Sequence, residues 1–273
     1  MRYRQIAPPE PLRSYIQYFW TLESDLFDLS AKRFGPLADG CPGIIVQRKE
    51  TGVYSDEDQK VLPQLFLYGQ TVTRKALYFR GRFETLGICF YPHALKSLFG
   101  FDAHELTDSC LDLNLLTARK KDHLEELLVS STVPARQIEL LSAYLSLHAH
   151  GNPGRIDAAT HAVLFEIAQC RGNLFLPDLQ NRLGLSERTL ERKFQQQVGI
   201  SPKLYARISR FQASLQQLRA NRDAKLSDIA YDNGYTDQSY FIRSFKEFTG
   251  LSPRQFKTQA GHIPGDDSPI SLV

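Results

Sequence analysis

The chain has 273 residues, of which 42% are hydrophobic and 23% charged, which is typical of a folded globular protein rather than a disordered or fibrous one. Two domains are expected at this length. No segment has the roughly 18 uncharged apolar residues that a membrane-spanning helix needs. The first residues lack the apolar core of a signal peptide, so the sequence predicts a cytoplasmic protein with no membrane partner.

The sequence lacks the usual motifs of catalysis and of metal binding. Cys41, Cys89, Cys110 and Cys170 are far apart and form no CxxC or Cys/His cluster, so they are interpreted as small buried hydrophobic residues. The pair His148–His150 ends a helical pattern, where residues two apart point in different directions. No GxSxG, HExxH, GxGxxG or GxxxxGK[ST] pattern occurs. We therefore expect no enzyme, no cofactor and no bound metal.

The first half of the chain has the pattern of short strands separated by turn residues. The predicted strands are Tyr15–Leu22, Ile44–Val46, Leu65–Tyr68, Ala76–Phe79 and Leu86–Tyr91, and the turn signal Asp39–Gly43 precedes the second of them. Such a pattern indicates an antiparallel sandwich or barrel. The many aromatic residues of these strands either line a cavity for a small-molecule effector or form the core.

Helical patterns follow the strands. Pro92 suits the first turn of a helix that ends at Phe99 before Gly100, and two longer helices are predicted at 122–129 and at Pro134–His148. The last two either close the core of their own domain or form an interface with a second subunit. The sequence leaves this choice open, and with it the homodimer.

The charge is distributed unevenly between the two halves. Residues 1–154 contain 17 basic and 18 acidic residues, a net charge of −1, whereas residues 155–260 contain 16 and 10, a net charge of +6. A basic excess confined to one segment is typical of a module that faces phosphates. We therefore predict an α+β protein with a β-rich regulatory domain at 1–150, a helical domain at 155–260 and a flexible tail at 261–273.

The helical domain contains an internal repeat. Six residues recur 51 positions later: Arg192, Phe194, Gly199, Ser201, Pro202 and Tyr205 as Arg243, Phe245, Gly250, Ser252, Pro253 and Phe256. Upstream the offset is 50: Leu176, Asp178, Leu179 and Gly184 correspond to Leu226, Asp228, Ile229 and Gly234. A difference of one residue within a turn is what two copies of one supersecondary unit tolerate.

Each copy is predicted to be a helix, a tight turn and a second helix. In the first copy Gly184 forms the turn and Ser186 caps the second helix; in the second copy Ser227 caps the first helix, Gly234 forms the turn and Thr236 or Asp237 caps the second. This is the helix-turn-helix layout, in which the second helix enters the major groove of DNA. Between the copies, the segment after Pro202 carries a long apolar stripe: Leu204, Ile208, Phe211, Leu215 and Leu218.

The side chains that face away from the core are the candidates for contact with DNA. They are Arg188, Glu191 and Arg192 in the first copy and Gln238, Ser239, Ile242 and Arg243 in the second. Arginine pairs with guanine, glutamine with adenine, glutamate with cytosine, and isoleucine contacts the thymine methyl group. The alternatives are that Arg192 and Arg243 contact only phosphate, or that both faces are merely solvated.

Residues 155–260 resemble the DNA-binding domain of the AraC/XylS family of bacterial transcription regulators. The resemblance rests on Leu183, Gly184, Leu185, Ser186, Leu190, Arg192, Phe194, Gly199, Ser201, Pro202 and Arg210, and on Ile229, Ala230, Gly234, Tyr235, Ser239, Tyr240, Phe241, Arg243, Phe245, Lys246, Gly250, Ser252 and Pro253. It implies a transcription regulator, most often an activator, that binds double-stranded DNA and contacts RNA polymerase. It also implies an N-terminal domain that binds an effector or mediates dimerisation. That half is similar to an uncharacterised β-rich domain of such regulators, through Asp39–Gly43 and Gly87–Leu98.

Overall fold

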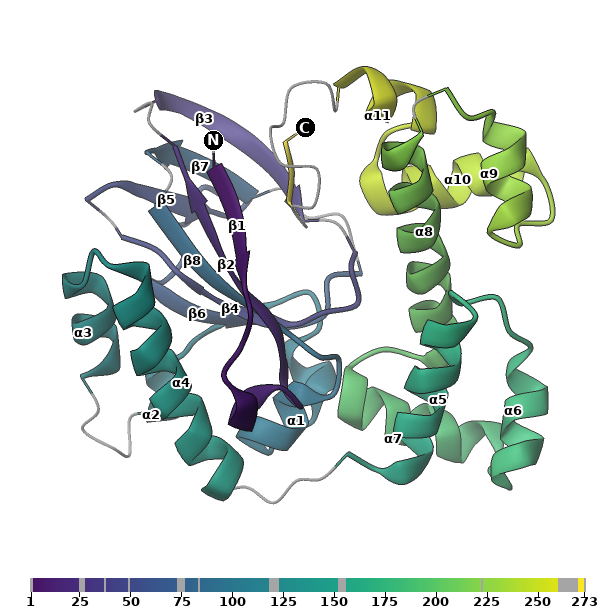
Figure 1. Ribbon diagram of the computed structural model, residues 1–273, viewed down its shortest axis with the longest axis horizontal. Helices are drawn as coiled ribbons and strands as arrows, with labels where there is room; N and C mark the ends of the chain where they lie inside the picture. Colours follow the sequence, from purple (N-terminus) through teal and green to yellow (C-terminus); the bar gives the residue numbers. More distant parts are fainter. Residues whose placement is uncertain are drawn as a thin grey trace.

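The computed structural model describes residues 2–24, 28–36, 38–48, 50–72, 77–82, 84–117, 123–151, 156–221, 223–259 and 270–272. Figure 1 shows a β-rich part with helices packed beside it and a second part made of helices. The predicted α+β fold class is therefore confirmed. Among the described residues, none of the helices is long and apolar enough to cross a membrane.

The β-rich part consists of two antiparallel sheets. The first has the strand order β1-β2-β8-β4-β6-β9 and the second β10-β3-β7-β5. The first sheet is formed by β1 (Arg2–Ile6), β2 (Ile16–Glu23), β8 (Glu84–Phe90), β4 (Gly43–Val46), β6 (Leu65–Tyr68) and β9 (Cys110–Asp112). The second is formed by β10 (Ile270–Leu272), β3 (Asp28–Pro36), β7 (Leu77–Gly81) and β5 (Gly52–Ser55). The five predicted strands correspond to β2, β4, β6, β7 and β8; Ala76 lies outside the described residues.

Both faces of the six-stranded sheet are covered, and the alternation of side chains along β4 shows it. Ile44 and Val46 point into a core on the helix side, while Ile45 between them belongs to a second core with Trp20 of β2 and Phe79 of β7, which comes from the other sheet. Successive residues of a strand point to opposite faces, so one strand serves both cores. Trp20 and Phe79 are therefore core residues.

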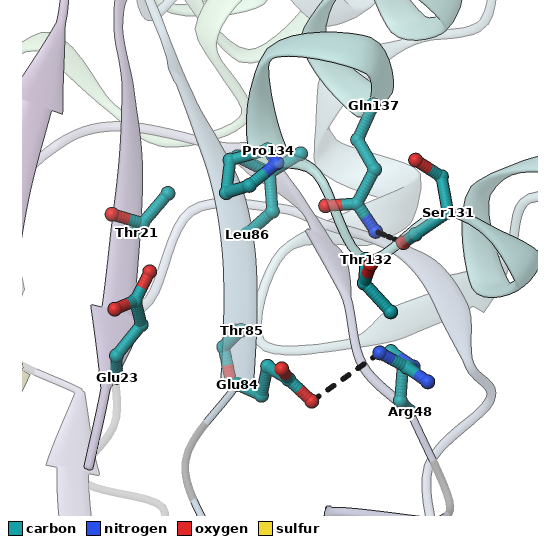
Figure 2. A pocket seen from close by; sticks show the side chains of 10 residues that line it. All are labelled: Thr21, Glu23, Arg48, Glu84, Thr85, Leu86, Ser131, Thr132, Pro134 and Gln137. Atoms are coloured by element: carbon teal, nitrogen blue, oxygen red, sulfur yellow. Dashed lines mark hydrogen bonds and ion pairs between the residues drawn. The ribbon is translucent and has the colours of Figure 1, made fainter. Parts of the chain in front are cut away.

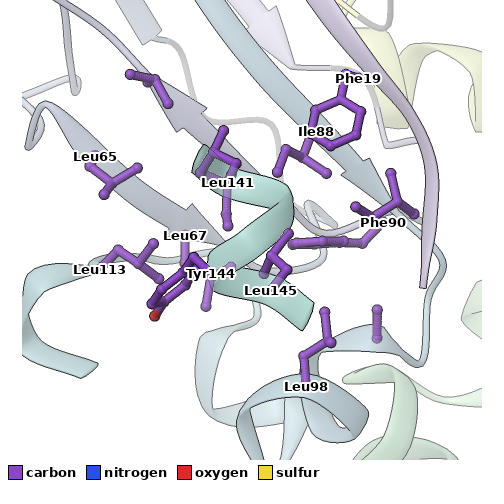
Figure 3. Close-up of a cluster of buried hydrophobic side chains, with 14 of the residues drawn as sticks. Phe19, Leu65, Leu67, Ile88, Phe90, Leu98, Leu113, Leu141, Tyr144 and Leu145 are labelled. Atoms are coloured by element: carbon purple, nitrogen blue, oxygen red, sulfur yellow. The ribbon is translucent and has the colours of Figure 1, made fainter. Parts of the chain in front are cut away.

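Helices cover the outer face of the six-stranded sheet. They are η1 (Glu10–Leu12), α1 (Ala94–Phe99), η2 (Ala103–Leu106), α2 (Asn114–Thr117), α3 (Leu124–Ser130) and α4 (Pro134–Gly151). Figure 3 shows Leu141, Tyr144 and Leu145 of α4 among the side chains of the sheet, and all three are buried. The α3–α4 pair was expected either to close the core of its own domain or to form an interface with a second subunit. The structure shows that it closes the core. Helix α1 begins two residues later than predicted, and Gly100 ends it at a φ of 83°.

The expectation of a flexible C-terminal tail is wrong for its last described residues. Ile270–Leu272 form β10, which pairs antiparallel with β3 at the edge of the four-stranded sheet. An exposed sheet edge offers unpaired backbone groups to any extended segment that reaches it, and the polar composition of the tail does not reveal such a partner.

The helical part is organised around one long helix, α8 (Pro202–Ala220). Figure 1 shows α5 (Ala158–Gln169), α6 (Leu176–Leu183) and α7 (Glu187–Val198) around one end of α8, and α9 (Leu226–Asp232), α10 (Gln238–Thr249) and α11 (Pro253–Gln259) around the other. On the predicted stripe of α8, Leu204 is half-buried and the remaining four residues, Ile208, Phe211, Leu215 and Leu218, are buried. Asp157 caps α5, as its sequence pattern indicates.

Candidate nucleic-acid interface

The first helix-turn-helix unit consists of α6, α7 and the turn between them. Gly184 ends α6 with a φ of 63°, a left-handed conformation that favours glycine, so the chain reverses within a few residues. Ser186 Oγ then accepts a hydrogen bond from the backbone N–H of Thr189 at 3.3 Å and starts α7. Leu190 and Phe194 point into the core and have no exposed surface. The opposite face of α7 is thereby turned outward.

The second unit repeats this arrangement with α9 and α10. The turn passes through Gly234 at a φ of 69°, where an added Cβ would lie 2.5 Å from the side chain of Asn173. Asp237 Oδ1 accepts a hydrogen bond from the Tyr240 backbone N–H at 2.7 Å and caps α10. Phe241 and Phe245 are fully buried. We call α7 and α10, the second helices of the two units, the recognition helices.

One predicted cap is wrong. Ser227 does not cap α9, because the helix already starts at Leu226 and the N-cap position falls on Lys225, whose side chain does not form a cap. Ser227 instead lies in the first turn, where its Oγ donates to Asp228 Oδ1 at 3.1 Å. Leu226 aligns with Leu176, the first residue of α6, so the repeat gives the start of the helix better than the capping preference does.

The seven candidate contact residues all lie on the recognition helices. The six exposed ones are Arg188, Glu191, Arg192, Gln238, Ser239 and Arg243, while Ile242 is half-buried and packs against the helical core. Arg192 Nη1 donates to Gln196 Oε1 at 3.3 Å, one turn further along α7. The contact of the seven candidate residues with DNA stays a prediction.

The electrostatic character of the two outward faces differs. On α7 the carboxylate of Glu191 lies between two arginines, whereas on α10 the exposed Lys246 follows Arg243 by three residues and shares its face. The sequence reasoning did not assign a role to Lys246. The 51-residue repeat offers the signal, because it places Lys246 at the position of the uncharged Gln195 in the first unit.

Two arginines of α8 fix the frame that carries both units. Arg210 Nη2 donates to the carbonyl oxygen of Gly172 at 2.9 Å, and its guanidinium lies 5.7 Å from the centre of the Tyr235 ring. It thus contacts the segment after α5 and the turn of the second unit at once. Arg207 pairs with Glu247 of α10 at 2.5 Å. These contacts tie α8 to α10, to the turn of the second unit and to the segment after α5.

The β-rich part packs against the first recognition helix. Helix α1 and η2 both contact α7, and Thr107 Oγ1 donates to the Gly199 carbonyl oxygen at 2.8 Å, just beyond the end of that helix. The Lys96 ammonium beside Asp102 lowers the pKa of that carboxyl, and a hydrogen bond from Gln196 of α7 acts in the same direction. The contact surface thus begins one turn beyond Arg192.

A second contact joins residues 38–41, which we call the 38–41 loop, to helix α8. Gln212 Nε2 donates to the Ala38 carbonyl oxygen at 2.6 Å. Gly40 has a φ of 77°, and an added Cβ would lie 2.8 Å from the ring of Tyr205. Burial raises the pKa of the neighbouring Asp39 carboxyl to about 7. Sequence reasoning treated this segment as a turn and missed that it contacts the helical domain.

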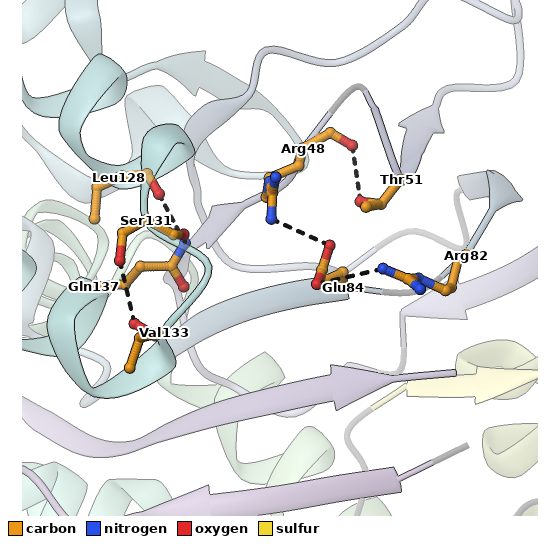
Figure 4. A network of polar contacts seen from close by, with 8 residues as sticks. All are labelled: Arg48, Thr51, Arg82, Glu84, Leu128, Ser131, Val133 and Gln137. Carbon is orange, nitrogen blue, oxygen red and sulfur yellow. Dashed lines mark hydrogen bonds and ion pairs between the residues drawn. The ribbon is translucent and has the colours of Figure 1, made fainter. Parts of the chain in front are cut away.

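The β-rich part has a small polar cavity beneath α4. Figure 2 shows Thr21, Glu23, Arg48, Glu84 and Gln137 among the side chains that line it, and its volume is ≈ 40 Å³. Figure 4 shows the network beside it, in which Arg48 Nη1 lies 3.4 Å and Arg82 Nη2 3.7 Å from the Glu84 carboxylate. A typical small-molecule site has about 300–1,000 Å³, so this cavity suits ordered water rather than an effector.

A larger groove lies between the two parts of the molecule. It has a volume of ≈ 550 Å³ and runs along α5 and α8 beside the 38–41 loop. Its polar and charged lining comes from Asp39, Arg171, Ser209, Gln212, Gln216 and Arg219. The groove is open to solvent and mixes both signs of charge. The groove borders the contact between the 38–41 loop and α8, because Asp39 and Gln212 both line it.

Comparisons with known proteins match the two parts separately. Residues 4–112 match a family described as a domain of unknown function (DUF6597), and residues 179–259 match a helix-turn-helix domain family. An uncharacterized HTH-type transcriptional regulator of Staphylococcus aureus is 31% identical over 85 residues, which are 31% of this chain and 11% of the relative. The HTH-type transcriptional activator RhaS of Escherichia coli is 34% identical over 77 residues, 28% of this chain and 27% of the relative. The chain therefore spans only a minor part of the length of these relatives.

Solved structures with a similar arrangement have low sequence identity. ToxT of Vibrio cholerae, with a bound unsaturated fatty acid, superposes with a TM-score of 0.46 at 14% identity, over 88% of this chain and 94% of that one. The C-terminal domain of AraT, a response regulator from Geobacillus stearothermophilus, gives a TM-score of 0.36 at 23% identity, over 42% of this chain and 93% of that one.

Two helix-turn-helix units on one long helix define the class of the helical part, which is a helix-turn-helix domain joined to a β-rich domain. Within that class, the domain is of the AraC/XylS type, and the relatives that match it are named HTH-type transcriptional regulators.

Proposed function

We propose that the protein is a sequence-specific, DNA-binding transcription regulator whose two recognition helices enter successive segments of one major groove. The observation that carries the proposal is the duplicated unit. Two helices of equal length, α7 and α10, each with a capped N-terminus and an exposed polar face, are held by the same helix α8. Helix-turn-helix units read adjacent segments about 34 Å apart, one helical turn of DNA.

The chemistry of the two outward faces supports different readouts. Arg188, Glu191 and Arg192 offer two guanine donors and one cytosine acceptor, whereas Gln238 and Arg243 suit adenine and guanine. Ser239 can donate to or accept from several bases. Ile242 is half-buried, and its free edge suits a thymine methyl group. Lys246 adds a phosphate contact beside this face.

The N-terminal domain is placed to control the first recognition helix. It contacts the C-terminal end of α7 and the Gly199 carbonyl just beyond it, and it contacts α8 through the 38–41 loop. We propose that a shift of α1 or η2 is transmitted to α7. We propose activation of transcription as the output, through contact with RNA polymerase, because the resemblance to the AraC/XylS family implies an activator and the similar protein RhaS is named as one.

Selection of bound sequences from a random DNA pool tests the proposal. The full chain is used at about 0.15 M salt, where attraction between exposed charges is already screened. Two enriched blocks about one helical turn apart are expected. A pool that shows no enriched sequence, while the protein retains salt-sensitive binding to any DNA, overturns sequence-specific recognition.

A second candidate is that the N-terminal half acts mainly as a small-molecule sensor or as a dimerisation module, with DNA binding as its output. The open groove beside α8 favours the sensor. A thermal-shift screen separates the two, because a ligand that binds the folded state raises the melting temperature with ligand concentration, whereas a dimer responds to protein concentration.

A further inference from the structure

Two cysteines and one aspartate that are far apart in the sequence meet at the contact between the two domains. The sulfur atoms of Cys41 and Cys89 and a carboxylate oxygen of Asp39 all lie within 4.8 Å of one another. The sheet brings them together: β4 pairs with β8 so that Gly43 lies opposite Cys89, and Cys41 precedes Gly43 by two residues. Cys89 is buried, while Cys41 and Asp39 are half-buried.

Hydrogen bonds orient Cys41 and Asp39. Gln17 Nε2 donates to Cys41 Sγ at 2.9 Å, and the Cys41 thiol donates to the Asp39 carbonyl oxygen at 3.6 Å. The backbone N–H of Cys41 donates to Asp39 Oδ1 at 2.9 Å and fixes the carboxylate. Partners of this kind around a ligand set are what a metal site needs to hold its ligands in place.

We propose that Asp39, Cys41 and Cys89 form a binding site for a thiophilic divalent cation, for which Zn²⁺ is the best match. Zinc binds thiolate sulfur at about 2.3 Å and carboxylate oxygen at about 2.0–2.2 Å, usually with four ligands. Three protein ligands leave one position for water. Two sulfur ligands favour zinc over magnesium or calcium, which take oxygen ligands. Binding releases the two thiol protons to solvent, because the thiolate is the ligand.

The cluster lies beside the contact between the two domains. Asp39 lines the groove along α5 and α8, whereas Cys89 is buried. The 38–41 loop accepts a hydrogen bond from Gln212 and packs Gly40 against the ring of Tyr205, both residues of α8. A cation bound to Asp39 and Cys41 therefore fixes the loop on which α8 rests. Metal binding itself does not depend on the proposed DNA-binding function.

Titration of the untagged, reduced full chain with Zn²⁺, and with Co²⁺ as a coloured probe, tests the proposal. One ion per chain is expected, with the near-ultraviolet absorption band of cobalt bound to thiolate. Cys41→Ser and Asp39→Asn should each weaken binding by at least about tenfold, since even outer partners of a metal site contribute that much. The double variant Cys110→Ser and Cys170→Ser, which changes cysteines outside the cluster, should bind as the unaltered chain does.

Three results overturn the site. They are the absence of stoichiometric zinc in the reduced chain, a cobalt spectrum without the thiolate band, and binding that survives both Cys41→Ser and Asp39→Asn. A chain that binds no zinc when reduced but forms a Cys41–Cys89 disulfide in air would make the pair a redox site instead. The cobalt spectrum of the unaltered chain needs no variant, so the test holds even where a substitution impairs folding. Circular dichroism checks each variant.

Discussion

The recognition helix of the first unit, α7, lies against α1 and η2 of the β-rich domain, whereas that of the second unit, α10, packs against α8, α9 and α11. Both helices have the same length, both begin at a capped residue and both bury two large apolar side chains one turn apart. The duplicated frame is therefore preserved, and what differs is the surroundings. The contacts with the N-terminal domain described above fall on the first recognition helix and on α8.

The outward faces of the two recognition helices also differ in charge. The face of α7 carries both signs of charge, with Glu191 between Arg188 and Arg192, while that of α10 carries Arg243 and Lys246. A carboxylate on the outward face repels phosphate unless it lies beside a base from which it can accept a hydrogen bond. Such a face therefore requires a DNA sequence that fits it more closely.

The largest expected effect comes from the cores of the two units. Phe194→Ala and Phe245→Ala should each lower the free energy of unfolding by about 3–5 kcal/mol, because each removes a fully buried ring. Phe245 should cost more, since its ring contacts those of Phe211, Phe241 and Phe256, whereas Phe194 has Tyr205 as its ring partner. Denaturation in urea measures both. A loss no larger than that of the control Phe165→Ala, whose ring is 57% exposed, would contradict the shared frame.

The next largest effect should come from Arg192 and Arg243, which occupy equivalent positions in the two units and should contribute to DNA binding. Arg192→Ala and Arg243→Ala should each weaken binding to the selected DNA by about 1–3 kcal/mol if the arginine pairs with guanine, with the loss confined to one block. A phosphate contact would instead lower affinity on all sequences and reduce the salt dependence. Fluorescence anisotropy at several salt concentrations separates these outcomes. Arg136→Ala, which changes an exposed arginine of the N-terminal domain, should leave affinity unchanged.

The helix caps offer a smaller and matched test. Ser186→Ala and Asp237→Ala should each cost about 1 kcal/mol of stability, because each leaves a backbone N–H at the start of a recognition helix without its acceptor. Asp237→Asn should retain the hydrogen bond and lose only the attraction between the charge and the helix dipole. Thermal melts report the difference. An unchanged melting temperature in Asp237→Ala would show that this cap does not stabilise α10.

The smallest expected effect sharpens the contrast between the units most directly. Thr107→Val removes the hydrogen bond to the Gly199 carbonyl and keeps the shape of the side chain. It should lower the free energy of unfolding by about 0.5–1.5 kcal/mol. DNase footprinting should show altered protection of the block read by α7 and unchanged protection of the block read by α10. An equal change at both blocks would mean that the N-terminal domain acts on the whole helical part.

The helical half could be predicted well because most of its signals are local. The caps at Ser186 and Asp237 and the inward residues of α7 and α10 depend on spacing within a few turns. The repeat, with offsets of 50 and 51 residues, is visible in the sequence alone. The sheets depend on partners that lie far apart, and spacing along the chain does not give them. Five strands were not predicted from the sequence: β1, β3, β5, β9 and β10. The polar strand β1 lacks a clear apolar alternation. The meeting of Cys41 with Cys89 follows from the register of β4 on β8, which no motif marks.

The most direct test of the central claim is to repeat the DNA selection with Arg192→Ala and with Arg243→Ala. Because each recognition helix is proposed to read its own segment, each variant should keep one enriched block and lose sequence preference in the other, and the two variants should lose different blocks. Enrichment of the unaltered two-block sequence by both variants would contradict the assignment of α7 and α10 as the reading helices.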